Sequence, residues 1–239
     1  MILSNDSLVS AQFSADEGFR LTSFKKGSLE VIDPTSPLFV GLRLKSDCPM
    51  APWTANQVQG YLSATLTGEN VWNGTSLAAR EGQAFKLQST ARLEEATLRF
   101  SHSVVSDTDS LVGNLFHLRL PQGPSHIEID AKDHYYDAGQ LQPLLQKWQR
   151  SEDGRINLPL DSDLNIGMHP LLNPTEGTIL LITSEYIAEV GYQSTNQESC
   201  WLIQYQRENP YISIGAVSSQ NPWKPNLTVS SINLSLRIL

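Results

Sequence analysis

The chain has 239 residues, 40% of them hydrophobic and 18% charged, which is the balance of a folded globular protein rather than of a disordered chain. Its formal net charge of −8 argues against a nucleic-acid partner, because nucleic acids are usually bound by a clustered basic face. No apolar run approaches ~20 residues, and the amino-terminal stretch lacks the basic and apolar regions of a signal peptide. We therefore expect a cytoplasmic protein with no membrane partner.

Polar and apolar residues alternate along most of the chain with the period of two that is typical of half-buried β-strands. In residues 96–105, Leu98, Phe100 and Val104 fall on one face of such a strand. His102 lies on the same face, so it is predicted to be a core histidine with a hydrogen-bond partner. The further segments of this kind are 113–121, 126–131, 178–186, 200–206, 211–218 and 230–239.

One segment departs from this period. Between residues 139 and 150, apolar side chains recur at helical spacing, and Pro143 would be tolerated in the first turn of a helix. The alternation elsewhere is punctuated by turn signals, with no linker long enough to divide the chain. We therefore predict a single domain over residues 1–239, a large antiparallel β-sandwich with one short helix near 139–150.

The sequence has no motif for a cofactor or a metal. Cys48 and Cys200 are too far apart for a metal-knuckle spacing. A phosphate loop, a His-x-x-x-His pair and a Gly-x-Ser-x-Gly elbow are all absent from the sequence. We predict no cofactor, and we expect a monomer or weak dimer.

Residues 51–61, APWTANQVQGY, resemble the P-W-x-x-N-R-x-x-x-G signature of the galactose mutarotase (aldose 1-epimerase) superfamily, with Gln57 in place of the arginine. The similarity continues, in the order that the family has, through segments 17–32, 113–121, 127–143, 158–165, 169–194 and 211–226. This resemblance implies a mutarotase-like β-supersandwich with a sugar cleft on the concave face of one sheet.

The resemblance also assigns positions to the catalytic groups. Mutarotation needs a base that takes the proton of the anomeric hydroxyl and an acid that protonates the ring oxygen. The family's glutamate falls on Ser218, or on Gly215 if the gap is placed differently, and neither is a general base at neutral pH. The family's histidine falls on Gly113 or Leu115. His117 keeps the same strand face, because the shift is even, so it could act as a relocated acid.

Other side chains have both a functional and a structural interpretation. Asp163, Asp161 or Glu185 could supply a relocated carboxylate, yet Asp161 and Asp163 are equally compatible with a surface turn. His117 and Arg119 share a strand face, which is also typical of a solvated polar face.

The predicted site combines His117 and Asp163 as catalytic candidates with a set of sugar-binding residues, namely Trp53, Asn56, Gln57, Arg119, Asp161, Ser218 and Gln220.

Three functions remain open. The first is a sugar-binding protein of this superfamily that lacks the usual catalytic glutamate. The second is an active, divergent aldose 1-epimerase that interconverts sugar anomers. The third is a scaffold or interaction subunit that keeps only the fold. Fold-level analogy favours the enzyme, but the missing glutamate favours the binding protein.

Overall fold

The structure is a computed structural model. It describes residues 2–4, 8–14, 20–33, 38–44, 60–66, 71–80, 83–106, 111–121, 123–130, 135–137, 142–143, 152–168, 176–194, 199–205, 207, 212–218 and 229–239. These residues form strands joined by turns, and none of them forms a helix that could cross a membrane.

The described strands form two antiparallel sheets, one of eleven strands and one of nine. Across the larger sheet the order is β1 (Ile2–Ser4), β2 (Val9–Ser14), β3 (Arg20–Lys26), β5 (Leu38–Leu44), β10 (Leu111–Leu118), β19 (Ile212–Ser218), β18 (Ser199–Tyr205), β15 (Leu164–Met168), β12 (Tyr135–Asp137) and β13 (Gln142–Pro143), while β4 (Leu29–Glu30) pairs with β3. Across the smaller sheet the order is β14 (Arg155–Pro159), β11 (His126–Asp130), β16 (Glu176–Ile182), β17 (Ile187–Ser194), β20 (Val229–Ile238), β9 (Thr97–Ser106), β8 (Gln83–Glu94), β7 (Val71–Arg80) and β6 (Gly60–Leu66).

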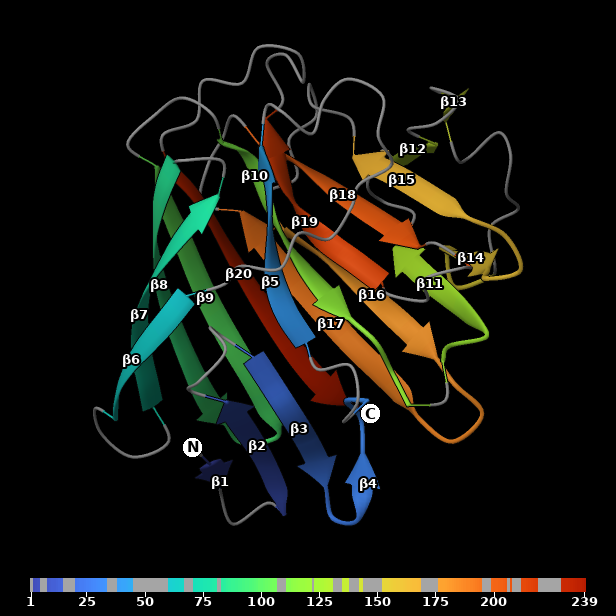
Figure 1. Ribbon diagram of the computed structural model, residues 1–239. Coiled ribbons are helices and arrows are strands. Elements are labelled where there is room, and N and C mark those ends of the chain that lie inside the picture. Colours follow the sequence, from blue (N-terminus) through green and yellow to red (C-terminus); the bar gives the residue numbers. More distant parts are fainter. Residues whose placement is uncertain are drawn as a thin grey trace.

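The two sheets pack face to face, and Figure 1 shows β5, β10 and β19 in front of β20 and β17. A hydrophobic cluster drawn from both sheets fills the space between them. The rings of Phe13 in β2 and Phe100 in β9 meet edge to face across this space, with centroids 6.2 Å apart. Leu118 of β10 and Ile214 of β19 are also buried there. The prediction of a large antiparallel β-sandwich is confirmed.

The structure shows no helix in the described part of residues 139–150. This part, Gln142–Pro143, is the strand β13, which pairs with Tyr136 and Asp137 of β12. The sheet order places β13 at an edge, where a proline is tolerated because its missing N–H faces no further strand. The rest of the predicted helix lies outside the described residues.

The side chain of Glu30 stabilises the β3–β4 hairpin of the larger sheet through hydrogen bonds. Its Oε1 accepts hydrogen bonds from the backbone N–H groups of Phe24 (2.8 Å) and Ile32 (3.2 Å), and its Oε2 accepts one from the hydroxyl of Ser23 (2.5 Å). Phe24 and Ile32 are fully buried. The carboxylate therefore satisfies donors that the strand ladders do not use.

We expect Glu30→Ala to lower the free energy of unfolding by about 1–3 kcal/mol, because buried N–H groups would lose their acceptor. Chemical denaturation in urea measures this change. Glu30→Gln is the matched control, since its amide oxygen can still accept one of the bonds, and it should cost less. A loss below ~0.5 kcal/mol for Glu30→Ala, the range of an ordinary surface substitution, would contradict the assigned role.

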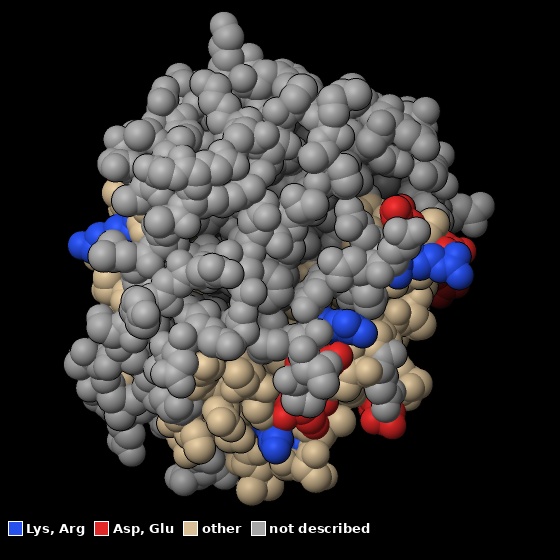
Figure 2. Space-filling model, in the orientation of Figure 1, with Lys and Arg blue, Asp and Glu red and all other residues tan. Residues whose placement is uncertain are grey.

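Several charged residues on the described surface form pairs of opposite sign. Figure 2 shows basic and acidic side chains next to each other on the part of this face that is described. Two examples on the smaller sheet are Arg237 with Glu189, 2.8 Å apart, and Arg155 with Glu128, 3.3 Å apart. Exposed pairs of this kind contribute little stability, about 0–1 kcal/mol each.

Candidate functional site

The strands that carry the expected catalytic positions, β10 and β19, are direct neighbours in the middle of the larger sheet. Their register pairs Leu115 with Gly215 and His117 with Ser213. These positions alternate with Leu118, Ile212 and Ile214, which are buried in the core. They therefore belong to the sheet face turned away from the smaller sheet.

The pairing continues outwards from His117 along one row across the sheet. On one side the row runs through Ser213 and Gln204 to Asn165 of β15. On the other side it runs through Phe39 of β5 to Arg20. The row thus brings a histidine, a serine, an amide pair and an arginine position onto neighbouring strands, in a pattern that their sequence separation does not reveal.

Arg119, a predicted sugar ligand, follows directly after β10. Its Nε lies 3.3 Å from Oδ2 of Asp33, and the backbone carbonyl of Arg119 accepts a hydrogen bond from the N–H of Asp33 at 3.0 Å. The aspartate side chain is largely buried, with 13% of it exposed. Arg119 therefore links the end of β10 to the segment after β4.

Asp161 and Asp163 lie in the exposed turn before β15. Oδ1 of Asp163 accepts a hydrogen bond from the backbone N–H of Arg207 at 2.8 Å, and the carbonyl of Asp161 accepts one from Nη1 of the same arginine at 3.4 Å. Both aspartates therefore contribute to a turn contact. The next residue, Leu164, begins β15, which lies three strands from β10, about 14 Å across the sheet.

Two other candidate residues lie elsewhere. Ser218 ends β19 and pairs with Ser199 of β18, so it is in the same sheet as His117. Glu185 lies in the turn between β16 and β17 of the smaller sheet, where its N–H donates to Oγ1 of Thr183 at 3.3 Å. The remaining predicted sugar ligands lie outside the described residues; they are Trp53, Asn56, Gln57 and Gln220.

His102 is a core residue, as predicted. Its side chain is 1% exposed, and its Nδ1 lies 2.7 Å from the hydroxyl of Ser89 on the neighbouring strand β8. Burial lowers the pKa of His102 from 6.5 to about 3, because the charged imidazolium would lose its hydration. The residue is therefore neutral near pH 7 and belongs to the core rather than to a site.

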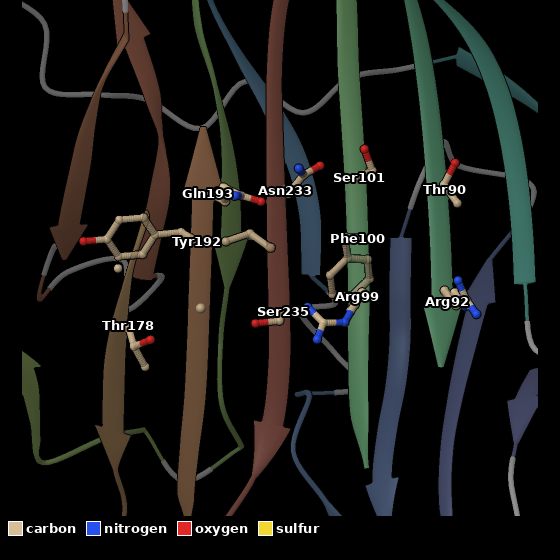
Figure 3. A pocket seen from close by; sticks show the side chains of 13 residues that line it. Thr90, Arg92, Arg99, Phe100, Ser101, Thr178, Tyr192, Gln193, Asn233 and Ser235 are labelled. Atoms are coloured by element: carbon tan, nitrogen blue, oxygen red, sulfur yellow. The ribbon is translucent and has the colours of Figure 1, made fainter. Parts of the chain in front are cut away.

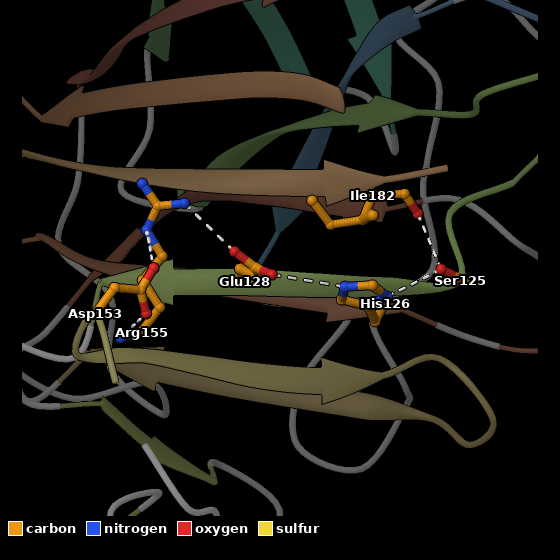
Figure 4. Close-up of polar contacts among 6 residues, drawn as sticks. All are labelled: Ser125, His126, Glu128, Asp153, Arg155 and Ile182. Carbon is orange, nitrogen blue, oxygen red and sulfur yellow. Dashed lines mark hydrogen bonds and ion pairs between the residues drawn. The ribbon is translucent and has the colours of Figure 1, made fainter. Parts of the chain in front are cut away.

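A second histidine takes part in a surface network at the edge of the smaller sheet. Nδ1 of His126 lies 2.9 Å from the hydroxyl of Ser125, and its Nε2 lies 3.7 Å from Oε1 of Glu128. Glu128 also contacts Arg155 of β14, which in turn lies 3.7 Å from Asp153 (Figure 4). The chain of contacts joins the edge strand β14 to β11. Among the described residues, no group of three or more His, Cys, Asp or Glu side chains could hold a metal ion.

The structure also has an open groove that the sequence analysis did not identify. It has a volume of about 590 Å³ and lies over β16, β17, β20, β9 and β8 of the smaller sheet (Figure 3). Its polar lining residues, such as Ser101 and Asn233, occupy the outward positions of the alternating segments 96–105 and 230–239. The hydroxyl and amide side chains at these positions are the only feature of the sequence that could have indicated the groove. The same pattern is also typical of a solvated strand face.

No protein-family model matches the sequence, and no curated protein matches it. Several solved structures match the fold. A candidate aldose 1-epimerase from Escherichia coli K12 has a TM-score of 0.65 and 13% identity, over 100% of this chain and 98% of that chain. A galactose mutarotase-related enzyme from Lactobacillus acidophilus has a TM-score of 0.61 and 13% identity, over 100% and 97%. A galactose mutarotase-like protein from Lactobacillus casei ATCC 334 has a TM-score of 0.62 and 10% identity, over 100% and 98%.

The fold is that of the galactose mutarotase-like proteins. The resemblance read from the sequence is therefore confirmed for the fold. At these identities the likeness does not extend to a reaction, because mutarotase-like proteins share a scaffold on which the site residues decide the chemistry.

Proposed function

We propose that the protein is a single mutarotase-like domain that binds a sugar on the outward face of the larger sheet, over β10 and β19, and does not catalyse conventional mutarotation. The pairing of Leu115 with Gly215 carries the proposal. These are the positions at which the family resemblance expects the histidine and, in one alignment, the glutamate. Neither leucine nor glycine can transfer a proton, so the scaffold would hold a sugar without the usual acid and base.

A divergent aldose 1-epimerase is the second candidate, and one observation favours it. His117 lies two positions from Leu115 on the same face of β10. It pairs with Ser213 of β19, the strand on which the family resemblance expects the catalytic glutamate. An epimerase also needs a carboxylate that reaches the same sugar ring. Of the predicted carboxylates, Asp163 directly precedes β15, which lies about 14 Å from β10 across the sheet, and its Oδ1 accepts a hydrogen bond from the N–H of Arg207. This separation of the two strands is larger than the roughly 6.5–9.5 Å between carboxyl groups that act on the two sides of one sugar ring, which favours the binding protein.

Polarimetry tests this proposal. We expect micromolar protein to leave the relaxation of α-glucose and α-galactose at or close to its spontaneous rate, since each positioned acid or base contributes about 10²–10⁴-fold and both are replaced. Calorimetry with the same sugars should detect binding that His117→Ala weakens. His126→Ala, a histidine on the smaller sheet, is the matched control and should change nothing.

A large acceleration that His117→Ala abolishes would overturn the non-catalytic proposal and make His117 the acid of an epimerase. The absence of both binding and acceleration across common hexoses would instead favour a scaffold or interaction subunit.

A further inference from the structure

The groove on the smaller sheet is built from two polar rows that follow the strand register. Gln193, Asn233, Ser101 and Thr90 are consecutive cross-strand partners and form the first row. Thr178, Gly191, Ser235, Arg99 and Arg92 form the second row in the same way. Figure 3 shows the side chains of each row side by side on the same face of the sheet. The second row crosses five strands, about 19 Å.

Gly191 in the second row leaves space for the side chain of its cross-strand partner Ser235. Gly191 has no side chain, and a Cβ added there would lie 2.4 Å from the hydroxyl of Ser235. The Ser235 hydroxyl thus occupies the space beside the bare backbone of β17.

Two arginines that share one carboxylate lie at one end of the groove. Arg92 and Arg99 are direct cross-strand partners, an arrangement that destabilises a sheet when the charges are alike. Glu94 lies 3.1 Å from Nε of Arg92 and 2.6 Å from Nε of Arg99, so one carboxylate serves two cations. Both contacts use Nε atoms. The three side chains together carry a net charge of +1, and both arginines are more than half exposed.

These features select a class of ligand. Hydroxyl and amide side chains both donate and accept hydrogen bonds, which suits a ligand covered with hydroxyl groups. The single excess positive charge suits one anionic group, bound through the outer guanidinium nitrogens. A nucleic acid would need many more cations than this pair supplies. A peptide strand would need unpaired backbone groups, but the groove lies in the middle of a sheet, where the ladders occupy them.

We propose that this groove binds a short saccharide that carries a carboxylate, with its hydroxyl groups along the two polar rows and its carboxylate at Arg92 and Arg99. A volume of about 590 Å³ falls within the ~300–1,000 Å³ of small-molecule sites. The inference is independent of the proposed sugar site on the larger sheet.

The test uses lactobionic acid, a disaccharide with one carboxylate, as the probe and its methyl ester as a neutral ligand with the same sugar chain. Calorimetry on the full chain at low salt should show that the acid binds and that the ester binds about tenfold or more weakly, because the ester cannot make charge-assisted hydrogen bonds. Binding of the acid should also weaken as salt is added. No binding of the acid at millimolar concentration, or equal binding of acid and ester, would overturn the proposal.

Two variants with opposite expected effects separate the site from general loss of folding. Arg99→Gln should weaken binding of the acid about tenfold or more. Glu94→Gln should strengthen it several-fold, because the excess charge rises from one to two, and a misfolded protein would not bind more tightly. Arg237→Gln, an exposed arginine outside the groove, is the control and should have little effect.

Equal affinities in wild type, Arg99→Gln and Glu94→Gln would place the probe elsewhere and overturn the assignment. His117→Ala should leave binding of lactobionic acid unchanged, whereas it weakens binding of a neutral hexose to the larger sheet. Failure of one site is therefore distinguishable from failure of the other.

Discussion

Phe100→Ala is expected to lower the free energy of unfolding by about 3–5 kcal/mol, as is usual for removing a buried aromatic ring. Phe100 is 2% exposed, and its ring meets Phe13 edge to face from the opposite sheet, at an interplanar angle of 76°. The strands on both sides of it, β8 and β20, are fixed by continuous ladders, so the backbone has little freedom to collapse into the cavity. Denaturation in urea measures the loss.

Two control variants show whether the loss of stability in Phe100→Ala is specific to the buried ring. Phe100→Leu keeps most of the buried volume and should lose clearly less stability than Phe100→Ala. Ser101→Ala, the next position on the same strand but exposed, should change the unfolding free energy by no more than ~0.5 kcal/mol. A loss below about 1 kcal/mol for Phe100→Ala would show that the sheets do not depend on this contact.

Stability is expected to fall steeply between pH 6.5 and about pH 3 because of His102. Burial lowers the pKa of this residue from 6.5 to about 3 in the folded protein. Above pH 6.5 both the folded and the unfolded states hold it neutral, and it adds no pH dependence. As the pH falls below 6.5, His102 binds a proton in the unfolded state but not in the folded state. The free energy of unfolding therefore decreases by up to ~1.4 kcal/mol per pH unit. The total loss reaches about 5 kcal/mol near pH 3.

Carboxylates titrate in the lower part of this range, so the test is a difference between variants. Urea denaturation from pH 7.5 to 4 should give a shallower pH dependence for His102→Gln than for the wild type, by about 1 kcal/mol per pH unit. Ser101→Ala, which replaces no titratable group and is exposed, should keep the wild-type slope. An unchanged slope in His102→Gln would mean that His102 takes up its proton in the folded state too.

Much of the fold followed from periodicity, because alternation reports directly which strand face is buried. Leu98, Phe100, His102 and Val104 all lie in the core, as the pattern of segment 96–105 predicted. The helix predicted near 139–150 rests on a short run of apolar residues, and such a run fits either a helix or a strand until the chain around it is known. The described part, Gln142–Pro143, is held by its pairing with β12.

The candidate sites were harder to predict, since they depend on which strands become neighbours. The sequence places His117 on the same strand face as Leu115, but its pairing with Ser213, almost a hundred residues later, is set by the sheet order. For Asp163 the sequence allows both a surface turn and a sugar ligand, and its hydrogen bond with the N–H of Arg207, which lies on a different segment, is visible only in the structure. The groove of the smaller sheet combines residues from five strands, and no single segment contains more than a fragment of it.

The position of β20 in the smaller sheet governs when that sheet can assemble during synthesis. β20 follows all the other described strands in chain order, yet it lies between β17 and β9. Until residues 229–238 have left the ribosome, β6–β9 on one side and β11, β14, β16 and β17 on the other are two fragments with no strand between them. Each fragment presents an unpaired edge during that interval, and such edges are prone to pair with other chains. The final strand therefore acts as the closing step, which joins the two halves at once and removes both edges.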